Sequence, residues 1–329
     1  MKGAPLRKLA LLLTVCLTVG VAASTAGARA QDTKLSLVAY STPREAYGRL
    51  ISAFQETPAG QKISFDQSYG ASGEQARAVI AGLKADVVAF SLEPDMTLLV
   101  KAGLVARGWK QDVFRGMVTR SIVVFAVRKG NPKKIHTWAD LIKPGVDVVT
   151  PNVQTSGGAK WNVMAAYGAQ IKQGKTHKQA VDYLKKLYSH VVSQDKSARE
   201  ALQTFIAGRG DVLLAYENEA IFAQKKSQPL DYVIPKATIM IENPIAVTTS
   251  SKNKPAARAF VKFLRTIKAQ LMFGENGYRP VLKNAAKTFG FKVPPRMFSI
   301  RRLGGWAKVD KRFFDPRTGI VTKIQKGRH

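Results

Sequence analysis

Short apolar runs and amphipathic stretches alternate along most of the 329-residue chain. The apolar runs predict strands at 34–40, 61–67, 85–91, 119–128, 146–149, 210–219 and 239–248, with the run at 210–219 feeding directly into a helix. Apolar residues at helical spacing predict helices at 95–102, 160–170, 178–190 and 255–267, and others that open after residues 41–45, 68–75 and 193–200. This alternation predicts an α/β fold with mostly parallel sheets.

Four strand-to-helix junctions are rich in Ser, Thr and Gly. They lie at 41–45, 68–75, 150–159 and 193–200. In the first, Ser41 or Thr42 is placed to cap a helix, with Glu45 completing a capping box. Ligands of α/β proteins collect at the carboxyl ends of strands, and the free N–H groups of helix starts favour an anion. We therefore expect an anion site where the junctions meet, although any one of them is also compatible with an ordinary serine-capped turn.

The first 30 residues have the pattern of a secretory signal peptide. Lys2, Arg7 and Lys8 precede the apolar run 9–23, and residues 28–30 read Ala-Arg-Ala, a small-x-small cleavage pattern. We expect cleavage before Gln31 and export of the mature chain. The single cysteine, Cys16, lies inside the apolar run, so the expected mature chain has no disulfide, thiol nucleophile or cysteine metal site.

The chain carries an unusual excess of positive charge. Residues 1–30 hold four of the 52 Lys and Arg and none of the 22 Asp and Glu, so 48 basic and 22 acidic residues remain, a net charge of +26. The basic residues are spread along the sequence without a cluster, which disfavours nucleic-acid binding and predicts a solvated basic surface that attracts anions. No two of His136, His177, His190 and His329 have the spacing of a helical zinc pair, and we expect no metal or cofactor.

The segment Thr155-Ser156-Gly157-Gly158 has a second interpretation, as part of a secreted serine hydrolase with Ser156 as nucleophile. The segment lacks the Gly-x-Ser-x-Gly elbow, and no histidine is marked as its base, which disfavours this interpretation.

Several segments in order resemble the periplasmic sulfate-binding proteins of bacterial ABC importers. They are 38–45 (Val-Ala-Tyr-Ser-Thr-Pro-Arg-Glu), 68–73 (Ser-Tyr-Gly-Ala-Ser-Gly), 127–132, 138–146, 150–152, 156–162 (Ser-Gly-Gly-Ala-Lys-Trp-Asn), 210–220, 278–280 and 304–308. The resemblance implies a two-lobed type II periplasmic-binding-protein fold with two crossover segments. It places residues 31–120 and 245–329 in lobe 1 and 121–244 in lobe 2. It further implies a monomeric, non-enzymatic protein that closes over sulfate and delivers it to ABC permease subunits for sulfate assimilation, with thiosulfate or another tetrahedral oxyanion as the alternative ligand.

The resemblance also implies the ligand-binding residues. Backbone N–H groups would come from Ser41, Ser72, Gly157, Gly158 and Ala198, and a hydroxyl from Ser156. Tyr216 stands where the family has a tryptophan whose indole N–H reaches the sulfate. A tyrosine hydroxyl can donate directly or through a water, or it can mark a changed preference, for example towards thiosulfate.

A site built only from donors suits sulfate, which has no proton to donate at neutral pH. A protonated phosphate would leave its own donor unpaired, at a cost of about 1–3 kcal/mol. The basic residues beside the junctions, Arg44, Lys160 and Arg199, are expected to form surface or inter-lobe ion pairs rather than to bind the anion.

Overall fold

The computed structural model describes Met1 and residues 33–327. The predicted signal peptide and Cys16 lie outside the described residues, as does His329. In the part of the chain described, no helix is long and apolar enough to cross a membrane.

The strands form one mixed sheet, in the order β2-β1-β3-β9-β4-β7-β5-β6, with β8 and β10 pairing to β4. Their bounds are β1 Thr33–Tyr40, β2 Ile63–Gly70, β3 Val87–Ala89, β4 Met117–Arg128, β5 Val148–Val149, β6 Val191–Ser193, β7 Val212–Tyr216, β8 Leu230–Val233, β9 Met240–Val247 and β10 Arg279–Pro280.

Strand direction divides this sheet into three parts. Strands β1, β2 and β3 pair in parallel, as do β5, β6 and β7. Between these groups stand β9 and β4, which pair antiparallel with each other and with their neighbours β3 and β7. The two parallel groups are therefore joined through two long antiparallel strands, so the crossover segments are themselves part of the sheet.

The helices cover both groups of strands. Their bounds are α1 Arg44–Gln55, α2 Ser72–Ile80, α3 Glu93–Lys101, α4 Gly157–Lys172, α5 His177–Ser189, α6 Ala198–Ile206, α7 Glu217–Lys225, α8 Lys254–Phe263, α9 Ile267–Glu275, α10 Lys283–Thr288, α11 Trp306–Val309 and α12 Ile320–Lys326. Short 3-10 helices lie at Trp138–Ile142 (η1) and Ile300–Leu303 (η2), and a π-helical turn at Asp310–Phe314 (η3).

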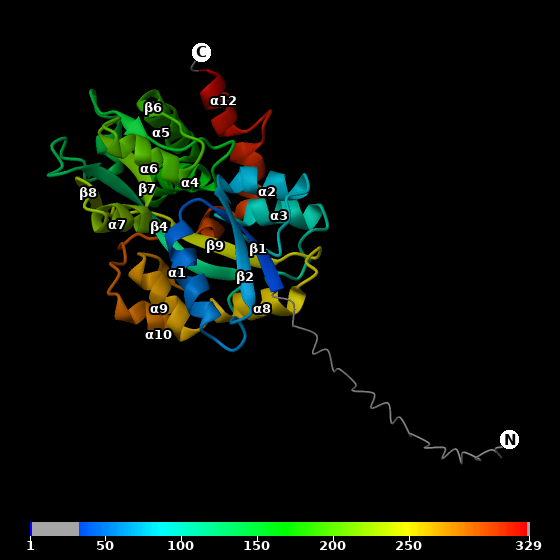
Figure 1. Ribbon diagram of the computed structural model, residues 1–329. Helices are drawn as coiled ribbons and strands as arrows, with labels where there is room; N and C mark the ends of the chain where they lie inside the picture. Colours follow the sequence, from blue (N-terminus) through cyan, green and yellow to red (C-terminus); the bar gives the residue numbers. More distant parts are fainter. Residues whose placement is uncertain (2–32, 328–329) are drawn as a thin grey trace. The chain divides into compact units, whose positions relative to one another are not determined.

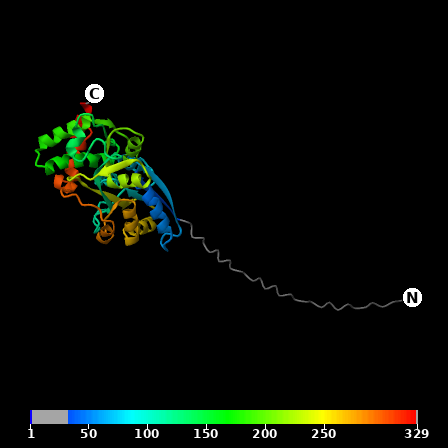
Figure 2. The ribbon, with the colours of Figure 1, turned by 90° about the vertical axis from the view of Figure 1, so that its left-hand side faces the viewer.

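The apolar side chains form separate cores around the two groups of strands. One core joins β1 and β3 to α1, α8 and α9, and another joins β5 and β7 to α4 and α5. The second core also receives Phe298, Trp306, Phe313 and Val321 from the C-terminal segment. Figures 1 and 2 show α12 beside the green helices of residues 150–200 rather than beside the blue N-terminal strand. The division into lobes stays a prediction, and the C-terminal segment packs mainly on residues 121–244.

The predicted strands and helices are largely present, with three local differences. The predicted helix 255–267 ends at Phe263, and a second helix, α9, begins at Ile267, where Thr266 caps it through the backbone N–H of Ala269. The predicted loop at 277–280 contains β10. The capping box at 41–45 is wrong, because Pro43 is the N-cap residue and no side chain caps α1.

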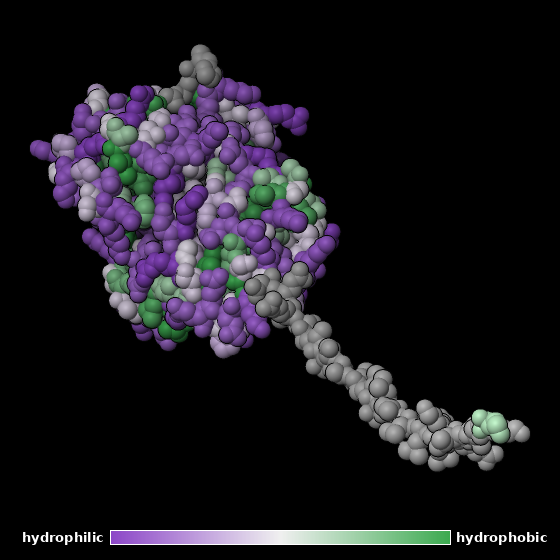
Figure 3. Space-filling model, in the orientation of Figure 1, coloured by the Kyte–Doolittle hydropathy of each residue, from purple (hydrophilic) through white to green (hydrophobic). Residues whose placement is uncertain are grey.

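Polar side chains cover most of the visible surface (Figure 3). Large apolar side chains with high exposure are few among the described residues, and Val113 and Val293 are the most exposed of those in the folded part.

Candidate functional site

The residues predicted to bind the anion lie at the starts of four helices and in one turn. Ser72 is the first residue of α2, and Gly157 and Gly158 are the first two of α4, with Ser156 as its N-cap. Ala198 opens α6, and Tyr216 is the N-cap residue of α7. Ser41 lies in the turn between β1 and α1.

Four of these residues meet at Gly158. A Cβ placed on Gly158 would lie 3.0 Å from Tyr216 Cε2, 3.2 Å from Ala198 Cβ and 3.3 Å from Ser156 Oγ. A larger residue at position 158 would therefore contact the other three, and glycine lets the main chain of α4 approach them closely.

Two hydrogen bonds, one between main-chain atoms and one from a side chain, join the other junctions to the same cluster. Gly73 N donates to Thr155 O at 2.9 Å, which joins the start of α2 to the turn before α4. Arg199 Nη2 donates to Thr42 O at 3.0 Å, which joins the start of α6 to the turn that holds Ser41. The seven predicted residues thus come from segments that are in mutual contact, although each segment is far from the others in sequence.

The cluster presents main-chain donors without acceptors. Among the described residues, the N–H groups of Ser41, Ser72, Gly157, Gly158 and Ala198 have no backbone or side-chain acceptor outside their own elements. Four of them are first or second residues of helices, where no acceptor within the helix exists. The side chain of Ser156 makes no capping hydrogen bond to α4. These donors and the helix dipoles behind them form a surface that favours an anion.

Tyr216 is buried and has a specific partner. Its hydroxyl lies 2.6 Å from Ser91 Oγ, and its side chain is 2% exposed. Its ring centroid is 6.3 Å from that of Tyr40, the residue before Ser41. Burial raises the pKa of the Tyr216 hydroxyl well above its ordinary value, so the group stays protonated at neutral pH.

Ser91, which follows β3, was not among the residues predicted from the sequence. Ser91 lies at the end of the predicted strand 85–91, and a polar residue at the end of a strand is the one signal that could have marked it. Its carbonyl accepts from Trp161 Nε1 and from Asn243 Nδ2, each at 2.9 Å. Ser91 is therefore held by side chains of α4 and β9 as well as by Tyr216.

Two of the three basic side chains beside the cluster, Arg199 and Lys160, form the ion pairs predicted from the sequence, whereas Arg44 packs on an aromatic ring instead. Arg199 bonds to Glu45 at 2.7 Å and to Glu219 at 2.8 Å, and Lys160 bonds to Asp310 at 2.7 Å. Arg44 lies over the ring of Tyr69, 4.9 Å from its centroid. The positive groups are thus engaged by carboxylates or a ring, and the donors of the cluster are uncharged.

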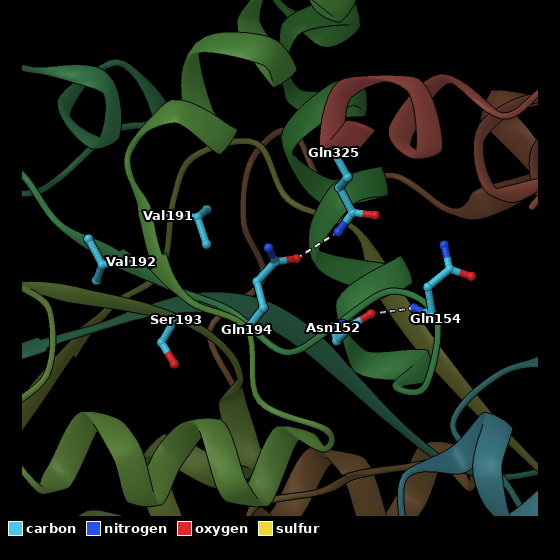
Figure 4. Close-up of a pocket in the computed structure, with 7 residues that line it drawn as sticks. All are labelled: Asn152, Gln154, Val191, Val192, Ser193, Gln194 and Gln325. Atoms are coloured by element: carbon cyan, nitrogen blue, oxygen red, sulfur yellow. Dashed lines mark hydrogen bonds between the residues drawn. The ribbon is translucent and has the colours of Figure 1, made fainter. Parts of the chain in front are cut away.

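A hollow of about 470 Å³ lies between β6 and the C-terminal helix α12 (Figure 4). In it the amide of Gln325 donates to Gln194 Oε1 at 2.7 Å, and Asn152 accepts from the backbone N–H of Gln154 at 2.8 Å. None of the seven predicted residues lines this hollow. In the part of the chain described, no group of three or more His, Cys, Asp or Glu side chains could hold a metal.

Three comparisons connect this arrangement to known proteins. The family described as bacterial extracellular solute-binding protein matches residues 35–279. The sulfate-binding protein of Synechococcus elongatus is 42% identical over 328 residues, covering 96% of this chain and 93% of that protein. The thiosulfate-binding protein of Pseudomonas aeruginosa is 33% identical over 312 residues, covering 91% of this chain and 93% of that protein.

A solved structure agrees with these matches. The sulfate-binding protein SubI from Mycobacterium tuberculosis superposes with a TM-score of 0.84 at 42% identity, covering 86% of this chain and all of that one. The predicted fold class, the type II periplasmic-binding-protein fold, is confirmed.

Proposed function

Because the chain belongs to the family of bacterial extracellular solute-binding proteins, we propose that it captures sulfate and delivers it to the permease of an ABC importer. The family binds solutes, and the related proteins are named for what they bind rather than for a reaction. The serine-hydrolase interpretation of Ser156 is therefore set aside, and Ser156 is proposed as a hydrogen-bond donor.

The proposal is supported by the helix-start N–H groups of Ser72, Gly157, Gly158 and Ala198, for which the described residues supply no acceptor, and by the contacts that join their segments to one another and to the turn at Ser41. A sulfate dianion accepts hydrogen bonds at every oxygen, so a pocket of N–H groups can satisfy it. The dipoles of α2, α4 and α6 offset part of the cost of burying its charge. Bonds of this kind to a charged acceptor contribute about 1.5–3 kcal/mol each.

Calorimetric titration of the mature protein with sulfate tests the proposal. We expect saturable binding at one site, and weaker binding in the variant Ser156→Ala by about tenfold, because one donor to a charged oxygen is lost. Failure of the wild-type protein to bind any of sulfate, thiosulfate or molybdate would contradict the proposal.

Thiosulfate is the second candidate ligand. A thiosulfate-binding relative supports it, and so does the replacement of the family's tryptophan by Tyr216. Competition between sulfate and thiosulfate in the same titration decides between them. If affinity for both is unchanged in Tyr216→Phe, the Tyr216 hydroxyl does not contact the anion.

The cellular setting follows from the same proposal. We propose that residues 1–30 are removed on export, and that the mature chain acts in the periplasm as a monomer. We further propose that residues 31–120 with 245–329 and residues 121–244 form two lobes that close over the anion. Mass spectrometry of the exported protein checks cleavage before Gln31, and light scattering checks the monomer.

A further inference from the structure

Ser91 and Tyr216 form a pair of buried hydroxyls beside the proposed anion site. Their oxygens are 2.6 Å apart, and the two residues are 1% and 2% exposed. A Cβ on Gly157 would lie 2.5 Å from Ser91 Oγ, and one on Gly158 would lie 3.0 Å from Tyr216 Cε2. The pair therefore lies against the start of α4, and the Ser91 side chain fills space that a side chain at position 157 would need.

The two hydroxyls have one proton more than their mutual hydrogen bond can use. Each hydroxyl carries one proton, and the bond between the two oxygens uses only one of them. In the part of the chain that the structure describes, each oxygen has the other as its only hydrogen-bond partner. One buried O–H group is therefore left without an acceptor. Because buried donors in proteins are almost always paired, this surplus proton points to a ligand that carries an acceptor atom.

The carboxylates nearest to this pair do not take the surplus proton. Glu219 and Asp95 both act on the pKa of the Tyr216 hydroxyl through their charge, but neither forms a hydrogen bond with it. Glu219 accepts from Arg199, and Asp95 accepts from Ser72 Oγ at 2.6 Å.

The chemistry of the two groups decides which hydroxyl gives its proton to the ligand. A phenol O–H is a stronger donor and a weaker acceptor than an aliphatic O–H, because a phenol loses its proton more readily. A hydrogen bond to a charged acceptor is stronger than one to a neutral oxygen, so the better donor pairs with an anion. Tyr216 then donates to the anion, and Ser91 donates to the Tyr216 oxygen.

The position of Ser91 is fixed by hydrogen bonds of its main chain. Ser91 N donates to Ser72 Oγ at 2.9 Å. Its carbonyl accepts from Trp161 Nε1 and Asn243 Nδ2, each at 2.9 Å. With its backbone held on both sides, Ser91 keeps its hydroxyl next to the Tyr216 oxygen.

We propose that Ser91 is a positioning residue of the anion site, which directs the Tyr216 proton at the bound anion. This inference rests on the proposed function, because it concerns a donor of the same site. In the proposed two-lobe arrangement, Ser91 belongs to residues 31–120 and Tyr216 to residues 121–244. Their hydrogen bond then forms when the lobes close, so loss of the Ser91 hydroxyl acts on the release of the anion rather than on its arrival.

The test is a double-mutant cycle of sulfate affinity, measured by calorimetric titration of the mature protein and repeated with thiosulfate. Tyr216→Phe keeps the ring and removes the donor, so it should weaken binding by about tenfold to a hundredfold, the usual effect of losing a hydrogen bond to a charged group. Ser91→Ala should weaken binding by about twofold to tenfold in the wild-type background. In the Tyr216→Phe background it should have no effect, because no proton is left to direct.

Ser121→Ala is the matched control. Ser121 Oγ is also buried and has no partner among the described residues, so its removal should leave the affinity unchanged in both backgrounds. Stopped-flow kinetics give a second readout. Ser91→Ala should raise the dissociation rate of the anion and leave the association rate close to that of the wild type.

The inference is overturned if Ser91→Ala weakens binding by the same factor in both backgrounds, which is the result of a purely structural role. It is also overturned if Ser91→Ala or Tyr216→Phe alone leaves the affinity unchanged, or if Ser91→Ala slows association without changing dissociation. Each of these results leaves the proposed function intact, since the wild-type protein still binds the anion. Absence of binding by the wild type would remove the proposed function itself.

Discussion

Gly157 is a residue whose neighbours leave no room for a side chain. A Cβ there would lie 1.9 Å from Leu92 Cδ2 and 2.5 Å from Ser91 Oγ, both of them buried. We expect Gly157→Ala to destabilise the protein by about 1–3 kcal/mol through overpacking, and to weaken sulfate binding because the start of α4 must shift.

The exposed helix residue Gly48 gives a matched control, because a Cβ there meets nothing within 4 Å. Gly48→Ala should stabilise by about 0.5–1 kcal/mol, the usual gain of alanine over glycine inside a helix. Urea unfolding of both variants measures the two effects. Equal stabilities for the two variants would contradict the prediction. They would mean that the start of α4 can move to make room for a Cβ at position 157 without a loss of stability.

The ion pair between Glu45 and Arg199 predicts a response to acid. Burial raises the pKa of the Glu45 carboxyl, but the hydrogen bonds and charge of Arg199 outweigh it and hold the pKa below its ordinary value. In the unfolded chain the pKa is about 4.3. The pair therefore stabilises the folded protein fully above about pH 4.3, and this contribution is lost as the pH falls through the lower folded pKa.

Melting temperatures of wild type and Glu45→Gln between neutral and acid pH check this expectation. The wild type should melt higher at neutral pH, and the difference should shrink below about pH 4. A difference that stays constant over the whole range would show that Glu45 stabilises by packing rather than by its charge.

Among the residues of the proposed site, the sequence marked the helix starts and did not mark Ser91. The starts at Ser72, Gly157 and Ala198 were recognisable because small residues after an apolar run are local signals, whereas their role as anion donors was implied by the family resemblance. The contact between Ser91 and Tyr216 was not recognisable, because it joins residues 125 positions apart and depends on how β3 and β7 are placed. The capping box at Glu45 failed for the same reason, since a distant arginine holds that carboxylate instead.

Among the elements, α11 is short but strongly anchored. Trp306 is 6% exposed and packs edge-to-face on Trp161 of α4, with ring centroids 4.7 Å apart. Because this tryptophan fills the core around α4 and α5, we expect Trp306→Ala to cost about 3–5 kcal/mol.

Val293→Ala is the control for Trp306→Ala, because Val293 is 66% exposed, and its substitution should change the stability by less than about 0.5 kcal/mol. Urea unfolding gives both values. A loss below about 1 kcal/mol in Trp306→Ala would mean that the C-terminal segment contributes little to the core.

Elements with a strong local pattern were predicted well, and short or edge elements were not. The runs that became β1, β4 and α4 show their periodicity within one window of sequence. Strands β6, β8 and β10 have two to four residues each, and they are extended because β5 or β4 pairs with them. Their extended conformation depends on pairing with a strand that is distant in sequence, and a local sequence pattern does not show such pairing.

For the whole molecule, the net positive charge predicts that the association rate of an anion depends on salt concentration. With 52 basic and 22 acidic residues, fewer than half of the basic side chains can pair one to one, and the remainder give the surface a positive potential. The association rate for sulfate should fall severalfold from about 0.01 to about 0.1 M NaCl, over which the Debye length shortens from about 30 to about 10 Å.

Stopped-flow measurements at each salt concentration test this prediction, with the dissociation rate as the internal reference. The dissociation rate should change less, because the proposed donors are uncharged. An association rate independent of salt would mean that the positive potential does not reach the entrance of the site.

The hydrogen bond from Gly73 N to Thr155 O provides a way to measure anion binding by hydrogen exchange. In the proposed two-lobe arrangement it joins the lobes through main-chain atoms alone, so no substitution other than proline at position 73 removes either atom of the bond. Its amide proton should exchange with deuterium quickly when the lobes part and slowly when sulfate holds them together. Deuterium uptake in a peptide spanning residue 73 would then report occupancy of the unlabelled, unmodified protein.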